Sequence, residues 1–568
     1  MFSSFRFSMA WLHTWVGLVL GYVLMIAFFF GSLSVFDREI DRWAIPESRF
    51  APQAMPSFDT MLKPIFQAIA PDEDELAAAR ERVGGPLPAT LPLMNWSAYT
   101  THRDPVLQMY AEYAVTNNPK DPDDHVHGHV TIDPRSGKLL PHDQLKIGSE
   151  FFYPLHYSLH LEWMSLGYWI VGLAALVMLA ALVSGVVMHR KIFREMFTFR
   201  PAKHIRRSVL DLHNLTGVVA LPFHFIFALS GLTIFAGIYL PLSETMLKPQ
   251  AEAHAMAEAQ AKGLAFKPAG VAAPIASVDA MVREAKRRWA ARDMPGEVGF
   301  LQLNHVGDAN GYVSIYRAGS DRVALVGQAV HFEASTGKVI LEEPAPTVVE
   351  NINTFLTGLH LQHFRHWLLR WFYVFGGLAG CACIATGFLF FVEKRKAQHV
   401  KQGHGGARWV DALAVTTVTG MLLATVAMLV ANRALPEHLA DRATWEKSIF
   451  WGAWLLAFAH AAWRTAAVAQ GRIAPAWREQ CWALAALAPL AVLLNWLTTG
   501  DHLGRTLAQG YWPVAGLDLA LLASGALAVF AARRLRRRER AAEAARSGAT
   551  PNASNAAVSP SAAKAAHA

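Results

Sequence analysis

The run from residue 7 to residue 36 reads FSMAWLHTWVGLVLGYVLMIAFFFGSLSVF and contains no charged residue. A membrane-spanning helix needs about 20 consecutive, mostly apolar residues, so this run is long enough to cross a bilayer. It is also too long for the apolar core of a secretory signal peptide. We therefore expect residues 8–36 to form a retained transmembrane span.

The rest of the chain has the same character. Of its 568 residues, 53% are hydrophobic and 17% are charged, whereas soluble proteins carry about 25% charged residues. This composition excludes a single soluble domain and a disordered chain. Apolar runs predict further spans at 153–189, 209–243 and 355–392, and four additional spans within 410–534. About eight spans result.

Basic residues gather in the segments 190–208 and 393–411 and at 533–540, where the tail begins. With eight spans all three clusters fall on one side of the membrane, and the excess of Lys and Arg marks the cytoplasmic side. Both termini are then cytoplasmic, and 190–208 is a basic cytoplasmic loop. The net charge of +8 is thus a topology signal, and we expect no nucleic-acid partner. The Ala/Ser/Pro-rich tail, 541–568, is predicted to be disordered.

Two long segments, 37–150 and 244–352, then face outward, on the side of the membrane away from the cytoplasm. Both mix charged residues, Gly/Pro turns and short alternating stretches, so each is large enough for a small α+β domain. The predicted fold is an all-α polytopic membrane protein with two small α+β periplasmic domains.

An internal repeat has an offset of 200 residues. Leu12-His13 returns as Leu212-His213, and Leu159-His160-Leu161 returns as Leu359-His360-Leu361, with several glycines in step. Each copy contains two spans around one outer segment, so both copies insert the same way up. Such parallel repeats are related by a pseudo-two-fold axis along the membrane normal.

Histidines lie at matching depths in these repeats. His13 and His213 are at the inner ends of their spans, whereas His160 and His360 are near the outer ends. Two facing imidazoles can take both axial positions of one haem iron. The repeat therefore predicts a four-helix core that holds two haems, one near each membrane face.

Other histidines compete for the same role. The alternative haem ligands are His224, His156, His189 and His363. The cluster His125-Val126-His127-Gly128-His129 has two interpretations, a surface metal site or a solvated polar loop.

The three cysteines lie inside apolar runs, and the sequence has no C-x-x-C-H motif. Any haem is therefore bound without a covalent link, as haem b. Nucleotide-binding and hydrolase motifs are missing too, so no catalytic residue is assigned.

The chain resembles the PepSY-associated transmembrane proteins, often labelled iron-regulated membrane proteins. The resemblance covers about 8–395 and rests on Leu12-His13-x-Trp15-x-Gly17, its echo at 212–217, and the stretch from Ser184 to Pro201 followed by Asp211-Leu212-His213-Asn214. It implies PepSY-type outer domains and an inner-membrane di-haem reductase that releases iron from ferric siderophores in the periplasm.

The expected function is transfer of electrons across the membrane to a ferric siderophore or another ferric chelate, a transmembrane ferric reductase activity. The electron donor is left open between a quinol and a membrane or cytoplasmic reductase. Two rivals remain. One is a transporter with a histidine relay for protons or metal, and the other is a non-catalytic PepSY module that binds a periplasmic protein.

Overall fold

The computed structural model describes residues 5–101, 104–116, 118, 121, 124–141, 144–189, 198–200, 205–240, 250, 253, 257, 261–324, 328–344, 346–401, 406–466 and 474–547. Most of the predicted basic loop, at 190–197 and 201–204, lies outside these residues, and so does the tail from 548. The tail prediction was wrong for residues 541–547, because the last helix continues to Ser547. Its Ala-, Arg- and Glu-rich sequence favours helix.

Six helical segments are long and apolar enough to cross a membrane. They are Phe5–Ser34, Trp163–Met188, Trp367–Lys394, Arg408–Ala434, Pro475–Thr499 and Trp512–Ala541. The helices that contain them are α1 (Phe5–Ser34), η4 with α6 (Trp163–Ser165, Leu166–Met188), α14 (Trp367–Lys401), α15, η5 and α16 (Gly406–Val415, Thr416–Gly420, Met421–Ala434), α18 (Pro475–Thr499) and α20 (Trp512–Ser547). The chain is therefore a multi-pass membrane protein.

A seventh candidate span is broken. Helices α8 (Ile205–Val219) and α9 (Leu221–Ile234) are bent by 62° at Ala220. Pro222 lies in the first turn of α9, where its missing N–H costs no hydrogen bond, but it cannot continue the preceding helix. The eighth predicted span corresponds to α17 (Arg442–Ala466). This helix has charged residues at both ends and is not one of the six segments that are apolar enough to cross a membrane. The count of eight therefore stays a prediction.

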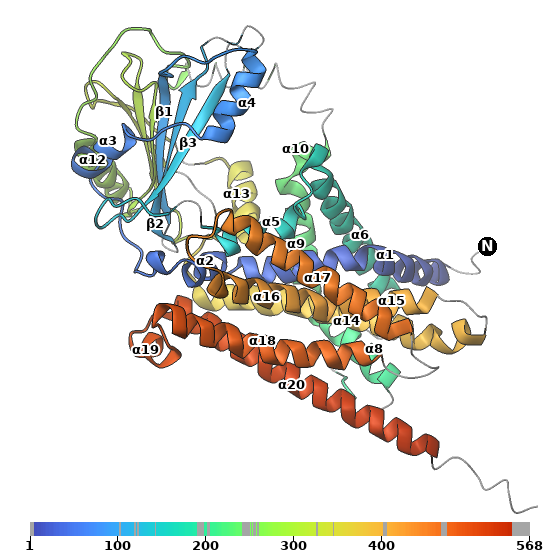
Figure 1. Cartoon of the computed structure of the whole chain (residues 1–568). Helices are drawn as coiled ribbons and strands as arrows, with labels where there is room; N and C mark the ends of the chain where they lie inside the picture. The colour runs from blue at the N-terminus through green and yellow to red at the C-terminus, as the bar shows by residue number, and fades with distance from the viewer. Residues whose placement is uncertain are drawn as a thin grey trace, which may run out of the picture.

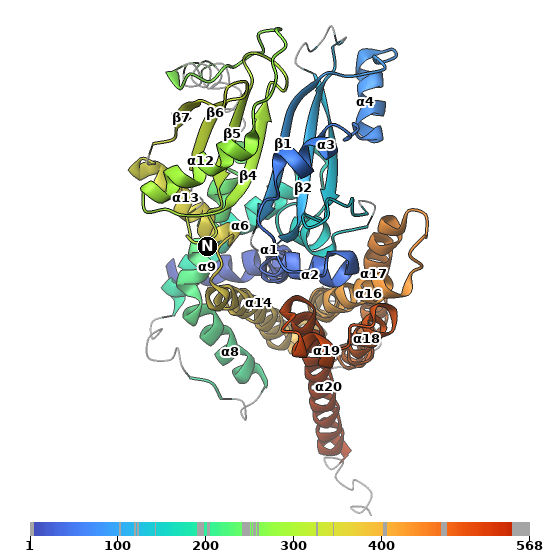
Figure 2. The ribbon, with the colours of Figure 1, turned by 90° about the vertical axis from the view of Figure 1, so that its left-hand side faces the viewer.

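The two repeats form one helical core. Helix α1 packs against α6 and α14, α14 packs against α8, and α9 packs against α6. In Figure 2, α8, α9 and α14 lie toward the lower left of the helical core, and the C-terminal helices lie toward the lower right. In Figure 1 the start of α1 and the end of α20 are both at the right-hand side, whereas the sheet is at the upper left.

The outer segments share one sheet instead of forming the two separate α+β domains that we predicted. The order β3-β2-β1-β4-β5-β6-β7 is antiparallel throughout, and β1 pairs with β4 across the repeat boundary, Ala98 opposite Leu301. The strands are β1 (Leu93–Thr101), β2 (Asp104–Ala114), β3 (His125–Ile132), β4 (Val298–Asn304), β5 (Tyr312–Arg317), β6 (Ala329–Glu333) and β7 (Val339–Glu342). Pairing β1 with β4 removes two exposed sheet edges at once.

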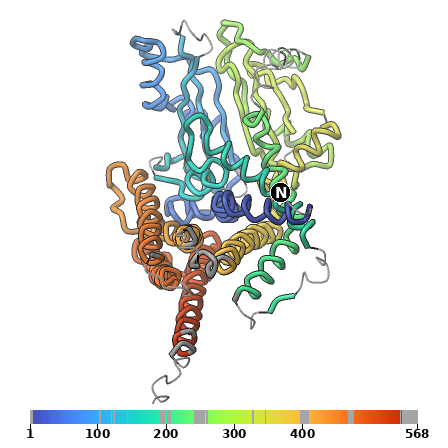
Figure 3. The backbone as a smooth tube through the Cα atoms, turned by 90° about the vertical axis from the view of Figure 1, so that its right-hand side faces the viewer, coloured from blue at the N-terminus to red at the C-terminus, as the bar shows by residue number. Residues whose placement is uncertain are grey.

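Short helices complete the structure around the sheet and the core. Figure 3 traces the backbone, with the blue and yellow-green sheet layer above the helical core. They are α2 (Asp37–Ala44), η1 (Pro46–Ser48), η2 (Phe58–Leu62), α3 (Lys63–Phe66), α4 (Glu73–Val83), η3 (Ile147–Phe152), α5 (Tyr153–Tyr157), α10 (Ala236–Tyr239), α12 (Val278–Ala291), α13 (Val348–Leu361) and α19 (Leu503–Ala508). The core of the sheet layer packs Trp96 against Phe58 and Phe66.

Two of these helices cap each other across the repeat. The carboxylate of Asp279 accepts from the Ser57 hydroxyl at 2.5 Å and from the backbone N–H of Phe58 at 2.8 Å. In return, Asp59 accepts from the Ser277 hydroxyl at 2.5 Å and from the N–H of Val278 at 3.1 Å. Each helix start thus receives a carboxylate from the other, which satisfies N–H groups that a helix start leaves without a partner.

The C-terminal helices hold the segment that joins α1 to the sheet. The buried Asp518 of α20 accepts from the indole N–H of Trp43 at 2.8 Å. Arg49 donates to Asn495 at 2.8 Å and pairs with Asp501 at 2.9 Å. These helices therefore brace the outer ends of the core.

Candidate functional site

An inner pair of histidines meets between α1 and α8. The rings of His13 and His213 have their centroids 6.1 Å apart and are nearly perpendicular, at 83°. Two imidazoles that bind one metal ion from opposite sides have ring centres about 6 Å apart, because each metal–nitrogen bond is about 2 Å long and each nitrogen lies about 1 Å from its ring centre. The spacing therefore suits a shared metal ion.

Backbone carbonyls fix the orientation of both inner rings. Nδ1 of His13 lies 3.0 Å from the Ala181 carbonyl of α6, and Nδ1 of His213 lies 2.8 Å from the Cys383 carbonyl of α14. A carbonyl oxygen can only accept, so Nδ1 carries the proton in each ring and Nε2 keeps its lone pair. Metal-binding histidines are typically held in this way.

An outer pair repeats the arrangement with His156 of α5 and His360 of α13. Their ring centroids are 5.9 Å apart, with an angle of 34° between the ring planes. The Nδ1 of His156 lies 2.7 Å from the Ala27 carbonyl of α1, so this ring also donates from Nδ1.

His360 is held by a hydroxyl group. Its Nδ1 lies 2.9 Å from the Ser230 Oγ of α9, and that hydroxyl donates its proton to the Ile226 carbonyl at 2.6 Å. The hydroxyl has only one proton, so it accepts from the Nδ1–H of His360. In all four rings Nδ1 is thus occupied as a donor and Nε2 keeps its lone pair, while the ring centroids of each pair lie about 6 Å apart.

A glycine on a neighbouring helix makes room for each of these four rings. A Cβ added at the glycine would lie 3.4 Å from His13 at Gly185, 3.3 Å from His213 at Gly387, 2.7 Å from His156 at Gly31 and 3.1 Å from His360 at Gly231. The outer two contacts are tighter than the inner two. Larger residues there would displace the rings.

A cavity of about 740 Å³ adjoins the outer pair. Cofactor pockets in proteins measure about 300–1,000 Å³. Its lining among the core helices is largely apolar and aromatic. Its polar end lies under the sheet, is called the mouth below, and is lined by Arg38, Tyr99, Gln108, Tyr110, Lys146 and Glu150. Neither inner histidine borders this cavity.

A known protein family matches the chain from α1 to α14, which includes both histidine pairs. Residues 10–394 match the family described as PepSY-associated TM region. This chain belongs to that family. An uncharacterized Pseudomonas aeruginosa protein is 25% identical over 380 residues, which are 63% of this chain and 88% of the relative. The matched region ends within α14, so the helices from α15 to α20 lie outside the PepSY-associated core.

Within this PepSY-associated core, the outer pair differs from the pair that we predicted, His160 with His360. The ring of His160 stacks on Phe151, and its Nε2 lies 2.8 Å from the Phe151 carbonyl. His156, which the sequence offered as an alternative ligand, faces His360 instead. His156 and His360 are each the last but one residue of their helix, α5 and α13.

A longer turn explains the difference. Helix α5 ends at Tyr157, and Leu159 and His160 both have φ 54° in the left-handed region. Eight residues separate α5 from α6, whereas five separate α13 from α14. The match of Leu159-His160-Leu161 to Leu359-His360-Leu361 therefore aligns a turn with a helix.

The remaining candidate histidines each have a different place. His224 is buried in α9, its Nε2 lies 3.2 Å from the Gly376 carbonyl, and its ring contacts Phe28. His189, after the end of α6, faces the Asn214 amide at 3.2 Å. His363, in the turn before α14, lines the outer cavity. Within the described part of the chain, the ring contacts pair neither His224 nor His189 with a second histidine.

Proposed function

We propose that this protein is a b-type di-haem membrane protein that carries electrons outward to a periplasmic ferric chelate, such as a ferric siderophore. The observation that carries the proposal is the two facing histidine pairs, with ring centroids 6.1 Å and 5.9 Å apart. His13 with His213 would hold one haem, and His156 with His360 the other. Bound haem supplies one-electron chemistry, because its iron exchanges between Fe(III) and Fe(II).

The chain keeps the two pairs apart along α1. His13 and the Ala27 carbonyl that orients His156 are 14 residues apart on this helix, which corresponds to about 21 Å. Phe28, next to Ala27 and hence at the outer level, packs edge to face on the buried His224 at 5.2 Å and lines the outer cavity.

The mouth of the outer cavity supplies the surface for an acceptor. Arg38 pairs with Asp104 at 3.1 Å, and Lys146 pairs with Glu150 at 3.0 Å. The lining here has two cations and two carboxylates, Asp37 and Glu150, so it carries no net charge, but its N–H groups and tyrosine hydroxyls can donate hydrogen bonds to oxygen-rich groups. Reduction weakens the hold of hard oxygen ligands on iron, so a chelate that receives an electron here releases Fe²⁺.

The orientation follows from the charges. The basic segments 190–208 and 393–411 mark the cytoplasmic side of a bacterial inner membrane, so the termini are inside and the sheet is periplasmic. The electron donor, a quinol or a membrane or cytoplasmic reductase, then approaches the His13 side.

Spectroscopy of the full chain in detergent tests the proposal. The purified protein should show a Soret band that shifts on reduction by dithionite, and a pyridine haemochrome assay should find two haems b per chain. A trishydroxamate ferric chelate should reoxidise the reduced protein, and an Fe(II)-specific chelator should trap the iron released.

Two results would contradict the proposal. A colourless chain would favour the transporter or the non-catalytic PepSY module. A coloured chain that no ferric chelate reoxidises would keep the haems but remove the ferric reductase activity. The variant H160A is the matched control, since His160 contacts Phe151 and lies outside both pairs.

A further inference from the structure

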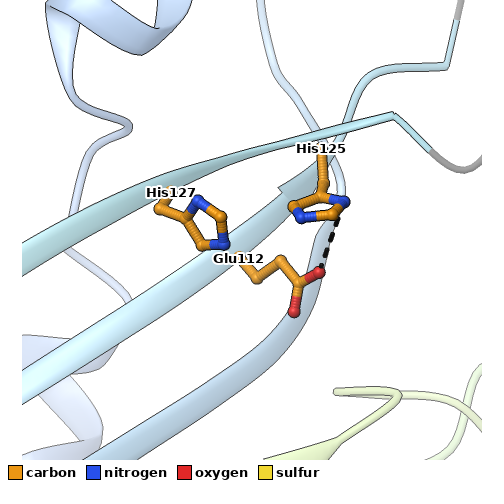
Figure 4. A group of neighbouring side chains, drawn as sticks. All are labelled: Glu112, His125 and His127. Carbon is orange, nitrogen blue, oxygen red and sulfur yellow. Dashed lines mark ion pairs between the residues drawn. The ribbon is translucent and has the colours of Figure 1, made fainter. Parts of the chain in front are cut away.

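The exposed face of strands β2 and β3 carries a group of metal-ligating side chains. His127 of β3 lies directly opposite Glu112 of β2, and His125, two residues earlier, is on the same face. Figure 4 shows the three side chains turned toward one another. The sequence interpretation of a solvated loop is thus wrong, since these histidines belong to a strand with Val126 buried behind them.

The three donors lie close enough to share an ion. One ligand atom from each of Glu112, His125 and His127 lies within 4.8 Å of the other two. A metal bound at about 2.1 Å from each donor needs donors about 3 to 4 Å apart, so exposed side chains close by about 1 Å on binding. Two imidazoles and one carboxylate suit Fe(II), Zn(II) and their neighbours, and leave coordination positions open.

Neighbouring groups hold two of the donors in place. The Glu75 carboxylate lies 3.1 Å from Nδ1 of His127 and fixes that nitrogen as the proton donor, so Nε2 faces the site. The Asn95 amide donates to one oxygen of Glu112 at 2.7 Å and leaves the other oxygen near His125, at 3.7 Å. Such orienting contacts are typical of metal ligands.

The path of the backbone before α4 places Glu75 next to strand β3. A Cβ added at Gly128 would lie 2.1 Å from the Ala70 carbonyl, so only glycine lets this segment cross the strand. The Asp72 N–H then donates to the His127 carbonyl at 2.8 Å, and the His127 N–H donates to Glu75 at 2.6 Å. The contact between Glu75 and His127 therefore depends on a specific crossing of the chain.

The group lies beside the mouth of the outer cavity. Tyr110 lines that mouth and is two residues before Glu112 on β2, on the same face, hence about 7 Å away. We propose that Glu112, His125 and His127 bind a divalent transition-metal ion. Resting on the proposed function, we assign this ion as the Fe²⁺ that leaves the chelate at the mouth.

Metal titration of the full chain in detergent tests the site. Co²⁺, followed by isothermal titration calorimetry, should bind at one site that H125A/H127A abolishes and E112Q weakens at least tenfold. The variant E75Q should weaken binding about tenfold, as orienting residues do. H438A is the control, because His438 is exposed in the loop between α16 and α17, and it should bind Co²⁺ like the unaltered chain.

Unchanged Co²⁺ binding by H125A/H127A would overturn the site, provided that the variant elutes as the unaltered chain does. Anaerobic Fe²⁺ should compete with Co²⁺ at the same site, and failure to compete would overturn the assignment of Fe²⁺. Haem content separates this proposal from the preceding one. A colourless chain that binds Co²⁺ would refute only the di-haem function, whereas a di-haem chain that binds no Co²⁺ would refute only the metal site.

Discussion

The inner and outer histidine pairs have nearly the same separation but different supports. Two backbone carbonyls orient the inner pair, whereas the outer pair uses one carbonyl and the Ser230 hydroxyl. The outer pair also borders the large cavity, and the inner pair does not. Side chains also contact the inner rings, since Ser184 Oγ lies 3.3 Å from Nδ1 of His13 and Cys383 Sγ lies 3.5 Å from Nδ1 of His213. The main difference between the two pairs is therefore the cavity beside the outer pair.

The largest expected effect separates His156 from His160. H156A and H360A should each lose one full haem equivalent and keep the inner haem, while H160A should keep both. H13A should lose only the inner haem. Pyridine haemochrome analysis, with electron paramagnetic resonance of the low-spin signals, counts the haems in each variant. Loss of a haem in H160A together with two haems in H156A would restore the pair that the sequence repeat predicted.

The glycine contacts predict the next largest difference. G31A places a methyl group 2.7 Å from the His156 ring, whereas G185A places one 3.4 Å from the His13 ring. Overpacking of this kind costs about 1–3 kcal/mol, so G31A should lower outer haem occupancy or thermal stability markedly. G185A should stay near the unaltered protein. Equal behaviour of the two variants would show that the outer ring moves freely.

A milder effect is expected at Ser230. The variant S230A removes the acceptor for the Nδ1–H of His360, and losing an orienting partner weakens metal binding by about 10–100-fold. Haem retention during dilution in apomyoglobin solution measures this loss. T233A is the matched control on the same helix, since its hydroxyl bonds to the Ser230 carbonyl and not to a histidine ring. Faster inner haem loss in S230A would contradict the assignment.

The smallest expected effect concerns the sheet above the outer pair. D59A removes the carboxylate that accepts from the first turn of α12, and D279A does the same for η2. Each should lower the free energy of unfolding of the outer layer by about 1 kcal/mol, as loss of a helix cap does. Hydrogen exchange in the sheet should increase for both, while inner haem content should not change. A change in only one of the two variants would contradict the interpretation that α12 and η2 cap each other.

The sequence alone predicted much of this architecture. Uncharged runs located the spans, since backbone groups in lipid must bond within a helix and their side chains must be apolar. The repeat offset correctly predicted that His13 lies next to His213, because both copies have the same number of residues from the start of the copy to this histidine. The PepSY-associated family was also identified from these motifs. These features depend on local composition and on regular helix geometry.

Only the tertiary structure decided the remainder. The repeat offset of 200 residues aligns His160 with His360, but it does not show that α5 ends before Leu159. The choice of His156 over His160 therefore depended on where the helices end. The pairing of β1 with β4 joins strands about 200 residues apart, and no local pattern encodes it. Likewise, Glu112 meets His127 only through strand register. Sequence periodicity specifies which face of an element is apolar, but contacts between elements depend on where turns end and strands align.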